Sequence, residues 1–280
     1  GFGGMDPSLR VANGGPGLGD PGVRAHQLKV LQELVEYPIE GIELDLAVPG
    51  GSRLIREGDS DAVRDAITEY VEAIADLARS KSMEIGARVL PTEALNLSDG
   101  LDVREWLRRG LLDFTVPLRY GYMVLDPDLP LEWLVGAAHD SGSAGYGMVQ
   151  PYSADASTGA TQPIHATSAH IRAAAANYRA KGVDGLYAWF LPWPMGETEK
   201  GILSDMKDGD LSRHRDKHYL VPRNVAPGEE LHYQVPLPVA IEAHETGIEH
   251  EIPFHIADDM ETETASINEV ILRMNVTDLV

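Results

Sequence analysis

The alternation of amphipathic helices with short apolar strands constrains the fold of this chain most. Apolar residues recur at helical spacing in five stretches, residues 23–37, 61–80, 103–109, 131–140 and 166–180. Six short apolar runs lie around them, residues 9–12, 41–46, 84–90, 113–117, 144–149 and 185–190. Strands that alternate with helices are typical of βαβ units, in which helices cover a parallel sheet. The sequence therefore predicts an α/β fold of the (β/α)₈ TIM-barrel type.

The pattern is too short for a closed barrel. A complete barrel needs eight strands in about 250 residues, whereas about six β/α units precede residue 196 here. We expect an incomplete barrel over residues 1–218. Its last part, residues 196–216, is expected to be a charged and irregular stretch. Unpaired sheet edges drive association, so we also expect either a homo-oligomer or a missing N-terminal segment that fills the gap.

The last part of the chain follows a different pattern. Residues 231–242, 249–256 and 266–276 alternate apolar and polar side chains, without helical periodicity. We expect residues 219–280 to form a small antiparallel β domain packed on the barrel, because so few residues seldom fold alone.

The composition excludes several classes of partner and cofactor. A net charge of −21 would be repelled by nucleic acid and by anionic membranes, so neither is expected as a partner. The chain has no Cys, which excludes disulfides and thiol nucleophiles. Its histidines show no metal-ligand spacing, so we expect no metal and no cofactor. The localisation is otherwise open, with an extracellular or periplasmic location favoured.

The run of residues 41–46 carries the strongest candidate for chemistry. Strand alternation places its Ile and Leu side chains on one face and Glu43 and Asp45 on the other. In a barrel the apolar face meets the helices, so both carboxylates are expected to point inward, with Asp45 nearer the C-terminal mouth. The same parity makes Arg88 an inward residue that pairs with Glu43 or Asp45 or binds a substrate carboxylate. The acids are then either a structural ion pair or a general acid or nucleophile for glycosidic bonds.

The loops after the strands supply further candidates. A second catalytic acid would come from one of three positions, of which Glu93 is closest in register to a strand and the others are Asp155 and Glu197. Aromatic rings at a barrel mouth suit stacking on sugars, although core packing explains any single ring as well. The expected substrate-binding residues are Arg88, Arg119, Tyr120, Gln150, Tyr152, Tyr187, Trp189 and Trp193.

Several motifs over residues 8–219 resemble the glycosyl-hydrolase-like TIM-barrel proteins of environmental bacteria, also described as family-10-glycosylhydrolase-like. They include residues 41–45, 88–92, 100–103, 110–113, 182–187 and 215–219. The resemblance implies a glycosidase-like reaction without naming a substrate. These proteins often carry an Arg soon after the strand Asp, in D-x-x-R-x-P, whereas residues 45–49 here read Asp-Leu-Ala-Val-Pro. If that Arg binds the substrate in the family, its absence here implies altered specificity or reduced activity.

Three functions stay open from the sequence. The first is a carbohydrate-active enzyme, a glycoside hydrolase that acts on a poly- or oligosaccharide with the inward carboxylates. The second is a polysaccharide lyase on uronic-acid chains, with Arg88 or Arg119 neutralising the substrate and Tyr120, Tyr152 or a His as base. The third is a non-catalytic glycan-binding or structural protein. Inward carboxylates within reach of each other favour hydrolysis, an Arg–Tyr cluster with every acid salt-bridged favours the lyase, and aromatics without a free acid favour binding.

Overall fold

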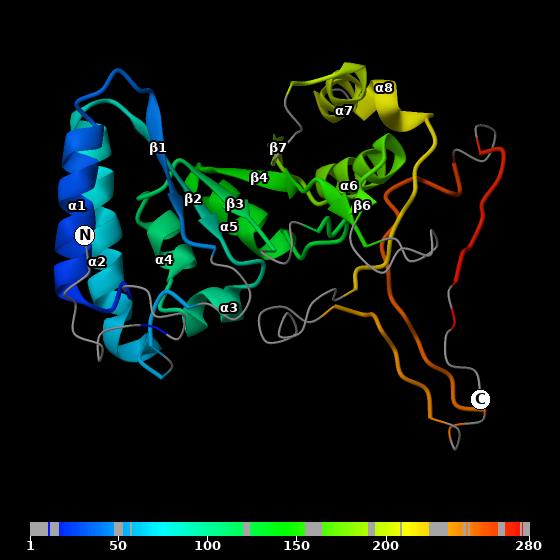
Figure 1. Ribbon diagram of the computed structural model, residues 1–280, viewed down its shortest axis with the longest axis horizontal. Coiled ribbons are helices and arrows are strands. Elements are labelled where there is room, and N and C mark those ends of the chain that lie inside the picture. The colour runs from blue at the N-terminus through cyan, green and yellow to red at the C-terminus, as the bar shows by residue number, and fades with distance from the viewer. Residues whose placement is uncertain are drawn as a thin grey trace.

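A parallel five-stranded sheet forms the centre of the protein in its computed structural model (Figure 1). The structure describes residues 11, 17–47, 53–56, 58–119, 124–154, 164–189, 194–207, 209–223, 235–242, 245, 247–262, 267–274 and 276. The strands are β1 (Gly41–Asp45), β2 (Glu84–Val89), β3 (Phe114–Pro117), β4 (Ala144–Val149) and β7 (Gly185–Ala188), in that spatial order. A short antiparallel pair, β5 (Tyr152–Ser153) and β6 (Ile164–His165), follows β4.

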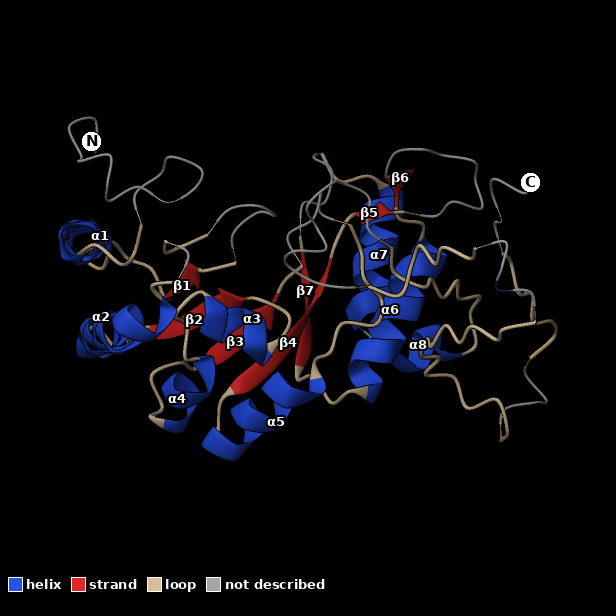
Figure 2. Ribbon diagram, turned by 90° about the horizontal axis from the view of Figure 1, so that it is seen from below, coloured by secondary structure: helices blue, strands red, loops and turns tan. Residues whose placement is uncertain are grey.

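Helices pack along one side of the curved sheet (Figure 2), and those that lie between β1 and β7 in the chain connect the parallel strands. They are α1 (Pro21–Leu34), α2 (Ser60–Ser80), α3 (Glu93–Ser98), α4 (Val103–Arg108), α5 (Glu132–Ser141), α6 (Ser168–Ala180), α7 (Glu197–Lys207) and α8 (Gly209–Arg213). Side chains close several of their N-termini. Asp20 accepts from the Gly22 amide at 2.5 Å, and Thr167 with His170 forms a capping box at the start of α6.

The main apolar core lies between the helices and the sheet. Ile85, Ala87 and Val89 of β2 are fully buried and face α2, whose Ile67 and Ile74 are also fully buried. This is the face that the strand alternation assigns to the helices, and it leaves the alternate residues for the concave face of the sheet. The fold therefore places apolar side chains on the helix side of the sheet and leaves the concave side for polar and charged ones.

The prediction of a parallel α/β fold is confirmed, and the sheet has the order of a partial TIM barrel. It is open over the described residues, with β1 and β7 as its edges. The predicted strand over residues 9–12 lies outside the described residues except for Val11, which is in no strand. The five predicted helices are present, with ends that shift by up to three residues, as expected for periodicity-based boundaries.

The prediction of irregular structure over residues 196–216 is wrong. This stretch forms α7 and α8. Its charges obscured an amphipathic pattern, in which Ile202 and Met206 of α7 are buried four residues apart against α6. The exposed face keeps the charges, such as the Lys200–Glu197 ion pair at 2.8 Å.

The predicted strands beyond residue 219 do not form in the part of the chain that the structure describes. One isolated bridge joins Arg223 to Leu237, and the antiparallel pair of this fold is β5–β6 instead. Apolar side chains alternate there as the sequence indicates, but Ile241 is 65% and Leu272 is 78% exposed. Alternating apolar and polar residues do not form a β-ladder when no neighbouring strand is present to pair with them.

The C-terminal residues nevertheless pack on the α/β part, as expected. The Asn177 side chain of α6 donates to the carbonyl of His255 and accepts from the amide of Ala257, both at 3.0 Å. Lys217 and Tyr219 both contact the Asp258 carboxylate, at 2.7 and 3.0 Å. The division of the chain between residues 218 and 219 stays a prediction.

Asp184, just before β7, connects this strand to β4 through hydrogen bonds of its carboxylate. Because a carboxylate titrates, this connection should make the stability of the fold depend on pH. Its carboxylate accepts from the Gly145 amide at 2.8 Å and contacts the His139 ring at 3.0 Å. Burial alone would raise the pKa of Asp184, but these two partners outweigh it, and the pKa is lowered. A lowered carboxyl pKa stabilises the fold above the unfolded-state pKa, and this contribution is lost as the pH falls through the folded-state pKa.

We therefore expect Asp184→Asn to lower the melting temperature at pH 7 and to differ less from the wild type as the pH falls below the usual Asp pKa of about 3.9. Calorimetry at pH 7 and pH 3 measures both gaps. The control is Asp76→Asn, on an exposed position of α2. A gap for Asp184→Asn that stays constant with pH would contradict the charge-based explanation.

Candidate functional site

Two carboxylates and one guanidinium meet at the carboxyl end of β1 and β2. Asp45 is the last residue of β1 and lies opposite Arg88 of β2 in the parallel register. Arg88 Nε donates to Glu43 Oε1, and Arg88 Nη1 donates to Asp45 Oδ2 at 3.1 Å. The prediction that Glu43 and Asp45 both face Arg88 is confirmed. This is the end of the strands at which TIM-barrel sites lie.

The three side chains differ in their exposure to solvent. The Glu43 side chain is 16% exposed and the Arg88 side chain 20%, whereas Asp45 is 43% exposed. Glu43 thus forms the inner end of the cluster, and Asp45 forms the outer end toward solvent. Of the two acids, Asp45 is the one that an incoming molecule reaches.

Tyr187 of β7 and Trp189, just after this strand, complete the cluster from across the concave face. The Arg88 guanidinium lies 4.4 Å from the centre of the Trp189 ring and 5.9 Å from that of Tyr187. The Tyr187 hydroxyl donates to Glu43 Oε1 at 3.5 Å. Since β1 and β7 are opposite edges of the sheet, these contacts span the interior of the curved sheet.

A close approach of two strands shapes the floor of the cluster. The Phe114 ring of β3 occupies the space beside Gly86, so a Cβ at residue 86 would lie 2.1 Å from that ring. Phe114 in turn meets Tyr146 of β4 edge to face, with ring centroids 5.6 Å apart. Only glycine at residue 86 admits this packing, and Arg88 is the next residue of β2 on the same face.

The surroundings of Asp45 favour its protonated form. Burial raises the pKa of Asp45 most, Arg88 lowers it, and the neighbouring Glu43 raises it again, with a net increase. Burial and the Glu43 charge likewise raise the pKa of Tyr187. Asp45 has a raised pKa, and its neighbour Glu43 is held by a guanidinium. Two acids in such different environments can serve different roles, one as a proton donor and one as a negative charge.

Arg119 and Gln150 lie together at the ends of β3 and β4. Gln150 is buried, and its Nε2 donates to the carbonyl of Arg119 at 2.7 Å. Arg119 is 3% exposed and donates to the carbonyl of Arg223 at 3.0 Å. These contacts connect the carboxyl edge of the sheet to the C-terminal part of the chain. No substrate role follows from them.

The other sequence-predicted residues are not brought to the carboxylate cluster by the contacts in the described part of the chain. Tyr152 lies in β5 and packs against the His165 ring, with centroids 4.9 Å apart. Both oxygens of Glu93 accept from Arg104, whose hydrogen bond lowers the pKa of Glu93, which disfavours it as a proton donor. Glu197 is 91% exposed and pairs with Lys200. Tyr120, Trp193 and Asp155 lie outside the described residues.

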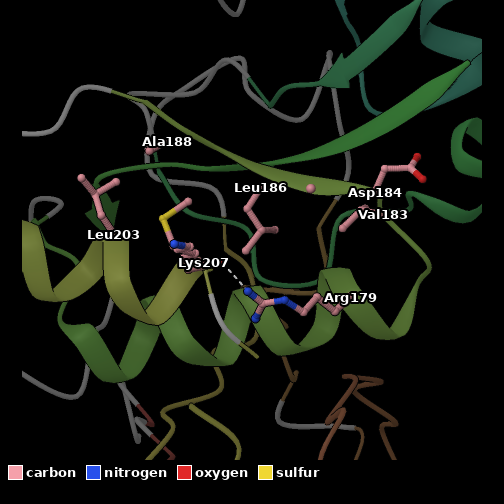
Figure 3. Close-up of a pocket in the computed structure, with 9 residues that line it drawn as sticks. Arg179, Val183, Asp184, Leu186, Ala188, Leu203 and Lys207 are labelled. Carbon is pink, nitrogen blue, oxygen red and sulfur yellow. Dashed lines mark hydrogen bonds between the residues drawn. The ribbon is translucent and has the colours of Figure 1, made fainter. Parts of the chain in front are cut away.

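A separate cavity of about 410 Å³ lies on the other side of β7 (Figure 3). Leu186 and Ala188 line it, and these alternate with Tyr187 and Trp189 along the strand. Leu203 and Lys207 of α7 and Arg179 of α6 complete its wall. The cavity therefore belongs to the interface between the sheet and the helices and does not open on the carboxylates.

The described residues contain no group of three or more His, Asp or Glu side chains placed to hold a metal ion. Within those same residues, no helix combines the length and the apolar character that crossing a bilayer requires.

Comparison with known proteins gives little beyond the fold. No family model matches the chain, and no curated protein matches it. The solved structures that are similar to it include the crystal structure of a chitinase from Chromobacterium violaceum ATCC 12472. The match has a TM-score of 0.45 and 10% sequence identity and covers 67% of this chain and 73% of the chitinase chain. A likeness at this level assigns no site, and the family suggested by the sequence motifs stays a resemblance.

Proposed function

We propose that this chain is a carbohydrate-active enzyme, a glycoside hydrolase in which Asp45 donates the proton to the leaving glycosidic oxygen. The observation that carries the proposal is the pairing of two unequal carboxylates on one guanidinium at the carboxyl end of the parallel strands. Glycoside hydrolysis uses one carboxyl group with a raised pKa and one ionised carboxylate. The raised pKa of Asp45 and the ion pair of Glu43 with Arg88 support this division of roles.

In this proposal each of the three residues has its own task. Asp45 is the more exposed acid, and burial raises its pKa, which is the direction that proton donation to a leaving group requires. Glu43 is nearly enclosed and forms an ion pair with Arg88, so in this proposal it is the acid that supplies negative potential to the centre of the site. Arg88 holds both carboxylates on adjacent strands in a fixed relation. The ionised carboxylate would stabilise the positive charge that develops on the sugar ring.

The same cluster supports a lyase less well. Both acids are salt-bridged and Tyr187 is beside Arg88, which is the arrangement that a lyase would use. However, Arg88 already serves two carboxylates, and a uronate would have to displace one of them. Burial raises the pKa of Tyr187, which makes that hydroxyl a weaker source of a base. A protein with a net charge of −21 also repels uronic-acid chains.

A panel of neutral, aminated and uronic-acid polysaccharides tests the proposal. We expect new reducing ends without unsaturated uronates, and an activity that falls as the pH rises through the pKa of Asp45, because the deprotonated acid cannot donate a proton. Unsaturated products would favour the lyase. Binding without cleavage across the panel would favour a glycan-binding protein. The absence of both binding and cleavage would overturn the proposal.

A further inference from the structure

We propose that Trp189 is a positioning residue, whose buried indole fixes the plane of the Arg88 guanidinium so that one nitrogen serves Glu43 and another serves Asp45. From the sequence, this ring is a candidate for stacking on sugars, with core packing as the alternative. The inference rests on the proposed function only for its consequence in catalysis, since the arrangement itself can be measured without turnover.

The contacts of Trp189 leave little of it for a ligand. The residue is 8% exposed and belongs to a buried cluster with Ala47, Leu90, Val116, Leu118 and Met148. These neighbours come from β1, β2, β3 and β4 or the residues just after them, so the indole is held by the sheet from several sides. A stacking platform for sugars needs an open ring face, and the Arg88 guanidinium lies over this ring at 4.4 Å.

The orientation of Arg88 decides which atoms it offers. A guanidinium is planar, and its donors point outward within that plane. Stacked on the indole, Arg88 directs Nε to Glu43 and Nη1 to Asp45. A cation over an aromatic face is also attracted to the ring, more strongly when both are shielded from water. The stack and the two salt bridges therefore select one rotamer of a long side chain that is otherwise free to turn.

Removing the ring should change the titration of Asp45. Without the indole, Arg88 keeps its contact with the enclosed Glu43 and is less restrained toward Asp45, which is 43% exposed. Asp45 then loses part of the electrostatic interaction with Arg88 that favours its charged form. An adjacent Arg lowers a carboxyl pKa by about 1–3 units, so a partial loss should raise that of Asp45 by roughly half a unit to one unit.

The experiment is a carbon-13 NMR titration of the Asp carboxyl groups, with the Asp45 signal assigned from Asp45→Asn. We expect Trp189→Leu to raise the Asp45 titration midpoint by about 0.5–1 unit, following the expected loss of the neighbouring cation. Trp189→Phe, which retains an aromatic face, should move it by less than half as much. The matched control is Trp133→Leu, since Trp133 lies 6.0 Å from Arg104, a cation that pairs with Glu93 instead.

A folded Trp189→Leu with an unchanged Asp45 titration would overturn the inference, as would an equal shift in Trp133→Leu or an equal shift in Trp189→Phe. Nitrogen-15 relaxation of the Arg88 Nε–H in the wild type decides the matter if Trp189→Leu does not fold. That group should be rigid compared with Arg108, whose side chain is 70% exposed, and equal mobility would overturn the inference. If no glycan is cleaved while Asp45 titrates as expected, the proposed function fails and the positioning role stands.

Discussion

Asp45→Asn should reduce glycan cleavage by about 10²–10⁴-fold while the protein stays folded, because proton donation to the leaving group is lost. Asn is nearly isosteric with Asp and can still accept the hydrogen bond that Arg88 donates at 3.1 Å. Asp45 is also 43% exposed, so the substitution creates no cavity. The measurement is kcat/KM on the best substrate of the polysaccharide panel, with the melting temperature recorded for each variant.

Two further variants show whether the loss of activity in Asp45→Asn is specific to this acid. Asp61→Asn changes an acid of the same type that is 89% exposed and pairs with Arg64, and its activity should equal that of the wild type. Glu43→Gln removes the ionised partner of Arg88 and should reduce activity as well, with a lower stability, because the enclosed guanidinium then loses its charged acceptor. Near-normal turnover of Asp45→Asn would mean that Asp45 is structural.

The carboxylate cluster was predictable because it depends on strand parity and on the order of neighbouring strands. In a parallel sheet buried on the helix side, the residues between the Ile and Leu side chains of β1 must share the opposite face. The run over residues 84–89 has the same parity, and the adjacent register brings Arg88 to Asp45. Short-range pattern and sheet order together therefore define this part of the site.

The parts that could not be predicted depend on contacts between distant segments. Nothing in the sequence near Trp189 shows that Arg88 will cover its ring, because this contact spans the sheet from β2 to β7. Gly86 could have given a signal, since a glycine inside a strand often marks a close approach of another group. Glu93 was misleading for the opposite reason. It follows β2 in the chain, but Arg104 of α4 engages both of its oxygens.

The C-terminal region illustrates a limit of periodicity. Alternation of apolar and polar residues predicts which side chains would share a face of a strand, and it does not say whether a partner strand is present. Conversely, α7 was hidden by its charged residues, although Ile202 and Met206 repeat at helical spacing. In both segments, the tertiary environment decided whether the local pattern became regular structure.

Trp106→Ala should lower the free energy of unfolding by about 3–5 kcal/mol, among the largest effects expected from a single substitution in this core. Trp106 is fully buried in α4, within the apolar core shared by α2, α4 and the sheet. Truncation removes the largest fully buried side chain of the described core and leaves a cavity that its neighbours cannot fill. It also leaves the Thr68 hydroxyl without the indole donor that it accepts from at 2.9 Å.

Urea titration followed by circular dichroism measures the change, and two variants divide it into its parts. Thr68→Val keeps the ring but leaves the buried indole N–H without its acceptor, for an expected cost of about 1–3 kcal/mol. Val30→Ala, at a position of α1 that is 55% exposed, should change stability by less than about 0.5 kcal/mol. A cost of Trp106→Ala as small as that of Val30→Ala would mean that α4 does not pack on α2 and the sheet in solution. A cost equal to that of Thr68→Val would assign the stabilisation to the hydrogen bond alone.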